Sequence, residues 1–103
     1  MDTFSILADK TRRSIVELLA QRGQMSATDI SDKFKVTPSA ISQHLKVLRQ
    51  SKIVIMEKDA QLRLYQINPQ SMEEIESWIK KIKQNWQNRF DKLDKILKSQ
   101  KRK

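Results

Sequence analysis

The stretch Thr37–Gln50, TPSAISQHLKVLRQ, decides the fold that this sequence predicts. Its start is marked twice, because Thr37 can cap free backbone N–H groups and Pro38 suits the first position of a helix. Apolar side chains recur along one face at helical spacing: Ile41, Leu45 and Leu48, with Val47 beside them. The other face carries polar side chains and no acid: Ser39, Ser42, Gln43 and Lys46. Such a face suits the major groove of DNA, where amides and hydroxyls meet base edges, although a solvated surface helix has the same pattern.

The residues before this stretch predict another helix, joined to it by a short turn. Ser26-Ala27-Thr28-Asp29 has the spacing of a capping box, with Asp in the place of the usual Glu. It predicts a short helix that continues through Ile30 to about Phe34, followed by a tight connection at Lys35-Val36. Two helices joined in this way, the second polar on its outer face, form the helix-turn-helix pattern. The usual glycine of the turn is absent, so the pattern alone is only moderately specific.

Two β-prone segments follow the second helix. Ile53–Glu57 is rich in β-branched residues, and Leu62–Ile67 alternates apolar and polar side chains. Lys58 to Gln61 would form the tip of a hairpin, although this tip lacks the glycine that tight turns prefer. A hairpin after a recognition helix is a wing, which could lay Lys58 and Arg63 against phosphates. A hairpin that covers the core is compatible with the same residues.

The N-terminal residues 2–22 predict either one kinked helix or two, and the pattern leaves both arrangements open. Residues 2–8 are typical of one or two helical turns. Asp9 is a candidate N-cap for a helix from Lys10 to Arg22 with one apolar face. Gly23 stands where a helix ends in the left-handed conformation.

The C-terminal third predicts one long helix. Ser71-Met72-Glu73-Glu74 is a second capping box, and the helical pattern continues to about Leu97. At ~1.5 Å per residue this helix would be on the order of 40 Å long, which is more than so small a domain needs. Apolar residues recur along it in steps of four and three, interrupted by Arg89. We therefore expect a dimer interface rather than packing on its own domain alone. The interface that we predict consists of Phe4, Leu7, Ile75, Trp78, Ile79, Ile82, Trp86, Phe90 and Leu93.

Composition narrows the classes of partner and compartment. The chain has 103 residues and a formal net charge of +9, which favours an anionic partner such as nucleic acid or a membrane surface. Only 38% of the residues are hydrophobic, so a monomer would have a thin core that a shared interface would enlarge. The absence of cysteine excludes disulfides, thiolate metal sites and cysteine nucleophiles. No apolar run approaches the length that spans a bilayer, so we expect a cytoplasmic protein.

Three collinear blocks of the sequence are recognisable as motifs of one family. Residues 7–15, LADKTRRSI, resemble the LADPTRRxIL opening of the arsenic-repressor (ArsR) family of bacterial winged-helix regulators. Residues 39–48, SAISQHLKVL, resemble its recognition segment xxVSxHLxxLxxxGLV, and Leu64-Tyr65 resembles the xxY that closes its wing. The chain departs from the family at Lys10, where Pro is common, at Lys52, where Gly is usual, and at the wing tip. These departures concern local turn geometry.

The resemblance implies a mostly α-helical winged helix-turn-helix with a small two-stranded β wing and a long C-terminal dimerisation helix. In relatives, the dimer places two recognition helices in successive major grooves and represses transcription by occupying a promoter. The implied divisions are residues 1–68 for the DNA-binding domain, 69–97 for the dimerisation helix and 98–103 for a basic tail. The tail would be a solvated terminus or would touch DNA phosphates.

The resemblance also implies which residues meet DNA. Carried over by position, the recognition helix would face DNA with Ser39, Ala40, Ser42, Gln43 and His44. Phosphate and wing contacts are implied at Thr28, Thr37, Lys46, Lys58 and Arg63. Gln43 is the best candidate for reading a base. We expect His44 to be half-buried, where it orients the helix or touches a phosphate, and to be neither a catalyst nor a metal ligand.

Metal and enzyme sites are not expected. Many ArsR-family members sense metals through cysteines or through Asp/His/Glu sets on the terminal helix. Here that helix offers Asp91 and Asp94 without a histidine, too few ligands for a stable zinc site. We expect these aspartates to pair with Lys95 and Lys98 instead. A single histidine, no cysteine and no Gly-rich phosphate loop leave no catalytic constellation. The sequence therefore predicts a regulator that needs no metal and no cofactor.

Two other classes of function fit parts of the sequence. A protein-interaction adaptor would keep the winged fold and bind a partner protein through the long helix, where Trp78 and Trp86 would be available. A basic amphipathic helix on a membrane surface is the weaker interpretation, because acids lie among its bases and an ordered domain precedes it. A gel shift against the chain's own promoter separates the DNA-binding regulator from the adaptor.

Overall fold

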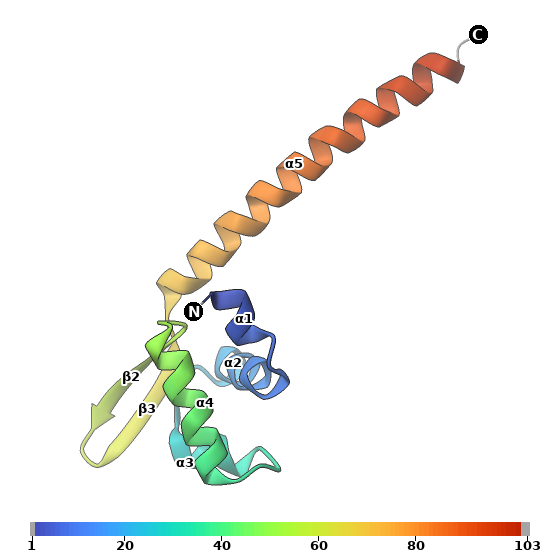
Figure 1. Cartoon of the computed structure of the whole chain (residues 1–103). Helices are drawn as coiled ribbons and strands as arrows, with labels where there is room; N and C mark the ends of the chain where they lie inside the picture. Colours follow the sequence, from blue (N-terminus) through green and yellow to red (C-terminus); the bar gives the residue numbers. More distant parts are fainter. Residues whose placement is uncertain (1, 102–103) are drawn as a thin grey trace. The chain divides into compact units, whose positions relative to one another are not determined.

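A computed structural model describes the backbone of residues 2–101 and the side chains of residues 2–98. The chain divides into two compact units, one up to Met72 and one from Glu73 onward, and each is described by itself. In chain order the elements are α1 (Thr3–Leu7), α2 (Lys10–Arg22), β1 (Met25–Ser26), α3 (Ala27–Asp32), α4 (Pro38–Gln50), β2 (Val54–Asp59), β3 (Leu62–Ile67) and α5 (Pro69–Lys101) (Figure 1).

The N-terminal segment forms two helices, which resolves the alternative that the sequence left open. Asp9 has an extended backbone conformation between α1 and α2, with φ −72° and ψ 127°. Its side-chain oxygen Oδ1 accepts a hydrogen bond from the backbone N–H of Arg12 at 3.0 Å, so Asp9 is the predicted N-cap. Gly23 ends α2 with φ 85°, a conformation that costs glycine little because it has no Cβ atom.

The helix-turn-helix has the predicted caps. The Ser26 hydroxyl accepts from the backbone N–H of Asp29 at the start of α3, and the Thr37 hydroxyl accepts from that of Ala40 at the start of α4, each at 3.1 Å. Pro38 occupies the first turn of α4, as predicted. α3 ends at Asp32, earlier than the expected Phe34, because the N–H groups of the next two residues already close a tighter turn onto Ile30 and Ser31.

The sheet has three strands in the order β1-β3-β2, all antiparallel, where the sequence predicted a two-stranded wing. The additional strand, Met25–Ser26, pairs with Tyr65 and Leu64. A strand of two residues carries no alternation that could reveal it in the sequence. The hairpin tip is also shorter than expected, because β2 continues to Asp59 and Ala60 turns the chain at φ 56°.

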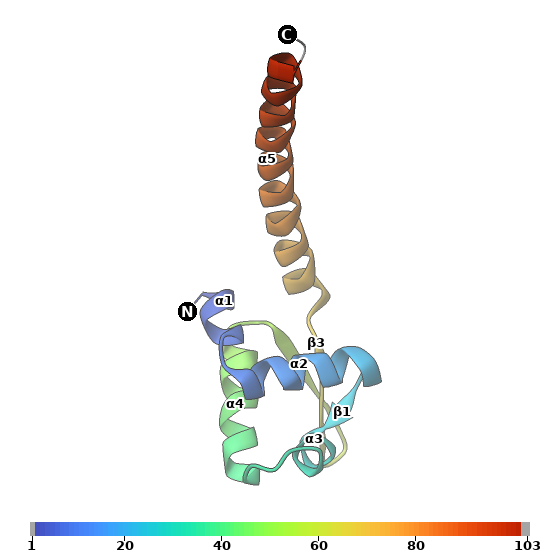
Figure 2. The same cartoon turned by 90° about the vertical axis from the view of Figure 1, so that its right-hand side faces the viewer.

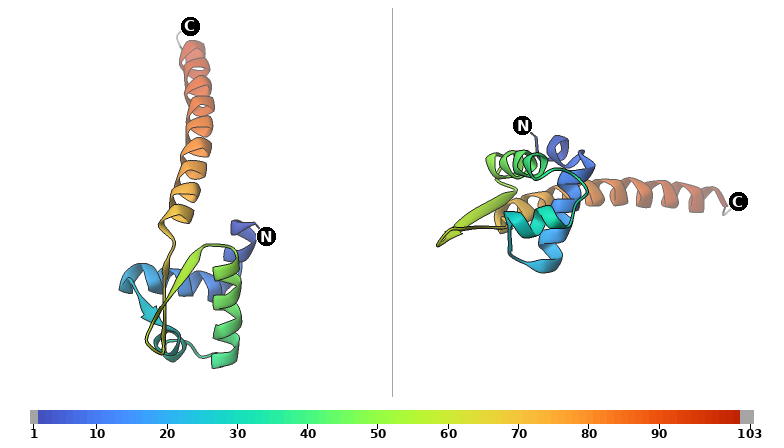
Figure 3. Two further views of the ribbon diagram at one scale, coloured as in Figure 1. Left: turned by 90° about the vertical axis from the view of Figure 1, so that its left-hand side faces the viewer. Right: turned by 90° about the horizontal axis from the view of Figure 1, so that it is seen from below.

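One hydrophobic core holds the first unit together, and every helix and strand from α1 to β3 contributes to it. Its buried members are Ile6, Ile15, Leu19, Met25, Ile30, Ile41, Leu45, Leu48, Ile53, Val54 and Tyr65. The apolar face of α4 lies inside this core, as its spacing predicted. Figure 1 shows the hairpin of β2 and β3 on one side of α4 and the helices α1 and α2 on the other. α2 crosses α4 (Figure 2), and the hairpin projects away from the helices when seen from below (Figure 3).

The start of α5 differs from the expectation. The helix begins at Pro69, and the cap is Asn68, whose side-chain oxygen accepts from the backbone N–H of Gln70 at 3.2 Å. Ser71, the predicted cap, is buried and donates its hydroxyl to the carbonyl of Lys52 at 2.9 Å. The capping box was therefore wrong in position, because Ser71 serves a contact with a distant segment.

The end of α5 also differs. The helix continues to Lys101, so residues 98–101 of the expected basic tail are helical, and residues 102–103 lie outside the described part. Lys98 forms the expected i,i+4 ion pair with Asp94 at 3.2 Å. Among the described side chains, the second expected pair, Asp91 with Lys95, does not form.

Candidate nucleic-acid interface

The outer surface of α4 is the candidate recognition surface. Burial of the stripe Ile41, Leu45 and Leu48 leaves the opposite side of the helix to solvent. The exposed side chains of this side are Ser39, Ser42, Gln43, Lys46, Arg49 and Gln50. At 3.6 residues per turn, Ser39 and Gln43 lie one above the other on the outermost line of the helix. This surface is polar or basic along its whole length and contains no carboxylate.

The structure does not bring all the predicted contact residues onto that line. Ala40 and His44 are half-buried on the flank of α4, and Thr28 is exposed at the start of α3. Thr37 is exposed, and its hydroxyl accepts the capping hydrogen bond while its own proton stays available to another acceptor. Contacts of these residues with DNA stay predictions.

His44 has a defined protein partner. An Nη atom of Arg12 lies 3.4 Å from His44 Nδ1, and Asp9 Oδ1 lies 4.0 Å from the same nitrogen. Because a guanidinium only donates, Nδ1 accepts in this arrangement and a neutral ring carries its proton on Nε2. Arg12 also donates from Nε to the carbonyl of Ile6 at 2.8 Å, so one side chain links α1, α2 and α4. The expected half-burial of His44 is confirmed.

Asp9 supports the same cluster electrostatically. The backbone hydrogen bond from Arg12 lowers the pKa of Asp9 below its ordinary value, and the positive character of His44 and Arg12 lowers this pKa further, against desolvation. The carboxylate is therefore ionised at neutral pH and holds the start of α2 beside the middle of α4.

The wing separates its charges between two faces. Lys58 lies directly opposite Arg63 in the pairing of β2 with β3, and Met56 lies opposite Tyr65. Opposite residues share a face and successive residues alternate, so Lys58 and Arg63 are on the face of Tyr65. Glu57 and Asp59 alternate with Lys58 and therefore belong to the other face. The two predicted wing cations thus act together on one side of the hairpin.

Arg49 is a candidate that the sequence prediction omitted. It lines a cleft between α4 and β3, together with Ser42, Lys46, Arg63 and Tyr65. The first three of these α4 positions follow each other at i, i+4 and i+7, a spacing that places them on one side of the helix. This spacing is visible in the sequence and could have identified Arg49, but the cleft depends on where the hairpin packs.

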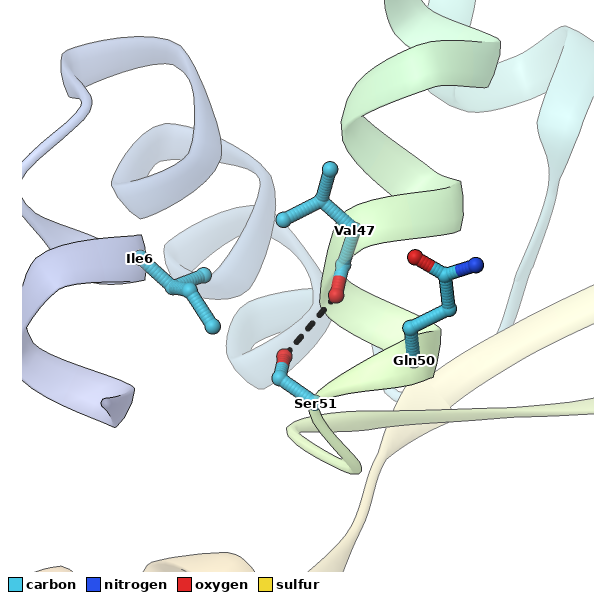
Figure 4. A pocket seen from close by; sticks show the side chains of 4 residues that line it. All are labelled: Ile6, Val47, Gln50 and Ser51. Carbon is cyan, nitrogen blue, oxygen red and sulfur yellow. Dashed lines mark hydrogen bonds between the residues drawn. The ribbon is translucent and has the colours of Figure 1, made fainter. Parts of the chain in front are cut away.

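A second pocket lies at the other end of α4, near α1. It is lined by Ile6, Val47, Gln50 and Ser51, and none of these residues carries a charge (Figure 4). The Ser51 hydroxyl donates to the carbonyls of Val47 and Leu48 at 2.9 and 3.1 Å. The pocket therefore marks the end of α4, where carbonyls without helical partners are satisfied, and it has no group suited to a phosphate.

The predicted dimer interface on α5 is exposed in this single chain. Trp86 is 65% exposed, and the exposed set also contains Phe4, Trp78, Ile79, Ile82, Phe90 and Leu93, while Leu7 and Ile75 are half-buried. Trp86 stacks on Phe90 with ring centroids 5.6 Å apart. A contiguous exposed apolar stripe of this kind marks an interaction surface.

Two classes of site were searched for in the described part of the chain. Within it, no three His, Cys, Asp or Glu side chains gather closely enough to hold a metal ion. No described helix is long and apolar enough to cross a membrane.

Known proteins are similar to this chain in sequence and in fold. The model of the family described as bacterial regulatory proteins of the arsR family matches residues 9–55. The transcriptional repressor SdpR of Bacillus subtilis is 31% identical over 78 residues, which are 76% of this chain and 86% of that protein. The arsenical resistance operon repressor of Escherichia coli is 31% identical over 97 residues, 93% of this chain and 80% of the repressor.

A solved structure gives the same result. An ArsR-like transcriptional regulator from a Rhodococcus species superimposes with a TM-score of 0.76 and 25% identity, covering 90% of this chain and 87% of that one. Its fold agrees with the recognition helix, wing and long terminal helix described above. The chain therefore belongs to the arsR family of winged helix-turn-helix transcriptional regulators, which are DNA-binding proteins and not enzymes.

Proposed function

We propose that this protein is a homodimeric, sequence-specific repressor that occupies a promoter through α4 and the wing and needs no metal effector. The observation that carries the proposal is the outer face of α4, which is exposed, free of carboxylates and flanked by a hairpin whose cations share one face. The two curated relatives carry the name of repressor, which supports repression over activation.

Base reading is assigned to the outermost line of α4. Gln43 has an amide that can bond an adenine edge through both its donor and its acceptor, and Ser39 can bond either kind of base-edge group. Lys46, Lys58 and Arg63 supply charge for phosphates, which position the protein without reading sequence. Thr28 and Thr37 add hydroxyl donors at the starts of α3 and α4, where backbone N–H groups also favour anions.

Dimerisation is assigned to the apolar stripe of α5, and its occupant is a second copy of this chain. The central stripe consists of Ile75, Ile79, Ile82, Trp86, Phe90, Leu93 and Leu97. Its successive steps are four, three, four, four, three and four residues, so the spacing is the same in both directions from Trp86. Such a stripe matches itself when a second helix lies antiparallel across a two-fold axis at Trp86. Two recognition helices then bind one operator, and the second contact becomes intramolecular.

Independence from metal is proposed from the donor groups of the sequence. The chain has no cysteine and one histidine, and that histidine is held by Arg12. We expect operator affinity to be unchanged when zinc, cadmium or copper is added at micromolar concentration. A metal-dependent loss of DNA binding in a gel shift would contradict this part of the proposal alone.

The test of the whole proposal is selection of bound fragments from the parent genome, followed by titration of the best fragment and of a scrambled duplex of equal length. We expect a dimer to bind the selected fragment at least ~10³-fold more tightly than the scrambled one at moderate salt. Equal affinities for both duplexes would contradict specific regulation and would favour the adaptor that uses the α5 stripe for another protein.

A further inference from the structure

The cleft between α4 and β3 gathers positive charge from two elements. Lys46 and Arg49 enter it from α4, and Arg63 enters it from β3. Lys58 stands opposite Arg63 on the same face of the hairpin and adds a fourth cation at the rim. All four side chains belong to the first unit, so the arrangement of this cleft is fixed by one core.

Negative charge is kept away from this cleft by strand alternation. Glu57 and Asp59 flank Lys58 in sequence and therefore point to the opposite face of the hairpin. Glu57 is engaged there, since its Oε2 atom accepts from the side-chain amide of Gln24 at 3.5 Å. No carboxylate lines the cleft among the described residues. The site therefore has an uncompensated positive potential, which favours an anion.

The cleft also contains a polar group that the fold leaves without a partner. Tyr65 is only 6% exposed and its ring is part of the core, yet its hydroxyl makes no hydrogen bond with any described residue. The hydroxyl is nevertheless not sealed from water, because no fully buried polar side-chain atom in the described chain lacks a partner. Tyr65 lines the cleft beside the Ser42 hydroxyl, so both can donate to an oxygen held there.

We propose that this cleft is a phosphate-binding site in which Tyr65, Lys46, Arg49 and Arg63 hold one phosphate group. The proposal rests on the function proposed above, and its occupant in the DNA complex is a backbone phosphate of the operator. This phosphate lies where the DNA strand passes from the groove that receives α4 to the groove that faces the wing. One phosphate held by both elements fixes the wing relative to the recognition helix. Arg49 and Tyr65 are thereby positioning residues of the DNA complex.

The first experiment replaces single operator phosphates by uncharged methylphosphonates. One position in each half-site should weaken binding of the wild-type protein about tenfold, as expected for loss of charge-assisted hydrogen bonds. The same replacement should weaken binding of Arg49→Gln by less than about twofold, because a contact already lost cannot be lost again. Tyr65→Phe keeps the core ring and should reduce wild-type affinity by about fivefold on any duplex.

The control is Arg22→Gln, which removes the same charge from the last turn of α2 and from no part of the cleft. This variant should keep the full tenfold methylphosphonate effect. If the effects of the methylphosphonate and of Arg49→Gln simply add at every position, the cleft holds no backbone phosphate and the proposal is overturned. Specific operator binding by Arg49→Gln would in that case leave the proposed function intact.

A second arm uses the protein without DNA and separates the two sources of phosphate. Inorganic phosphate is titrated against chloride of equal ionic strength while the side-chain Nε–H resonances of Arg49 and Arg63 are followed by NMR. Saturable shifts that vanish in Tyr65→Phe would support the site with free phosphate as an occupant. If phosphate and chloride shift both resonances equally and the methylphosphonate arm also shows no coupling, the cleft is no phosphate site.

Discussion

The apolar stripes of α4 and α5 have similar helical spacing and opposite exposure. Ile41, Leu45 and Leu48 are at most 1% exposed, whereas Ile82 and Trp86 on α5 are 44% and 65% exposed. α4 is covered by α2, α3 and β2 within the first unit, while the α5 stripe stays open in the single chain. The comparison teaches that helical periodicity predicts a face to be buried, but does not say whether the cover comes from the same chain.

Trp86→Glu tests the comparison most severely. If a second copy covers the α5 stripe at a two-fold axis, the substitution places two carboxylates together in an apolar interface, at a cost of several kcal/mol. We expect a monomer in sedimentation equilibrium at micromolar concentration and loss of operator binding in a gel shift. Circular dichroism should show an intact winged unit. A variant that remains dimeric would place the interface elsewhere.

A matched pair of leucines compares the two stripes directly. Leu48→Ala in α4 removes a fully buried side chain and should lower the free energy of unfolding by about 2–5 kcal/mol. Leu93→Ala in α5, at 54% exposure, should change the unfolding of the isolated protomer by less than about 0.5 kcal/mol and weaken the dimer instead. Urea titration at several protein concentrations separates the two effects. Equal losses at low concentration would show that α5 packs within its own chain.

Two neighbouring polar positions on α4 compare base reading with charge. Gln43→Ala should cost about 1–3 kcal/mol on the selected operator and little on a scrambled duplex. Lys46→Ala should weaken binding to both duplexes and reduce the salt dependence of the logarithm of affinity by about 0.9 per phosphate lost. Fluorescence anisotropy at several salt concentrations measures both. Identical losses on both duplexes for both variants would remove the roles assigned to these residues.

Short-range signals in the sequence predicted most of the winged unit. The caps at Asp9, Ser26 and Thr37 were predicted because each serves an N–H group three residues further along the same chain. The apolar faces of α2 and α4 were likewise predicted from residues one turn apart. These features depend on local geometry, so the sequence order is sufficient to find them.

The features that were missed depend on distant partners. Met25–Ser26 becomes a strand only because Tyr65 and Leu64 lie beside it. Ser71 donates to the carbonyl of Lys52 rather than capping α5, since the chain between them folds back through the hairpin. The cleft that makes Arg49 a candidate exists only when α4 meets β3. None of these relations has a local periodicity.

Asp9 offers a test that combines capping with charge. Asp9→Ala removes the cap of α2 and should lower the free energy of unfolding by about 1 kcal/mol at neutral pH. Because the pKa of Asp9 is lower in the folded protein than in the unfolded chain, its contribution is present above its ordinary pKa. The contribution is lost as the pH falls through the folded pKa, so the variant and the wild type should converge in acid. A difference independent of pH would assign the effect to packing.

Lys52→Gly should have the smallest effect and the opposite sign. Lys52 has φ 63° at the turn before β2, a conformation that costs a side chain with a Cβ atom more than it costs glycine. The backbone is held there because its carbonyl accepts from Asn68 and Ser71 at 2.8 and 2.9 Å. Relief of strain minus the added entropy of an unfolded glycine should raise the free energy of unfolding by about 0.5 kcal/mol. Urea titration should detect the gain in the winged unit, and dimer affinity should not change, because the substitution leaves the α5 stripe as it is.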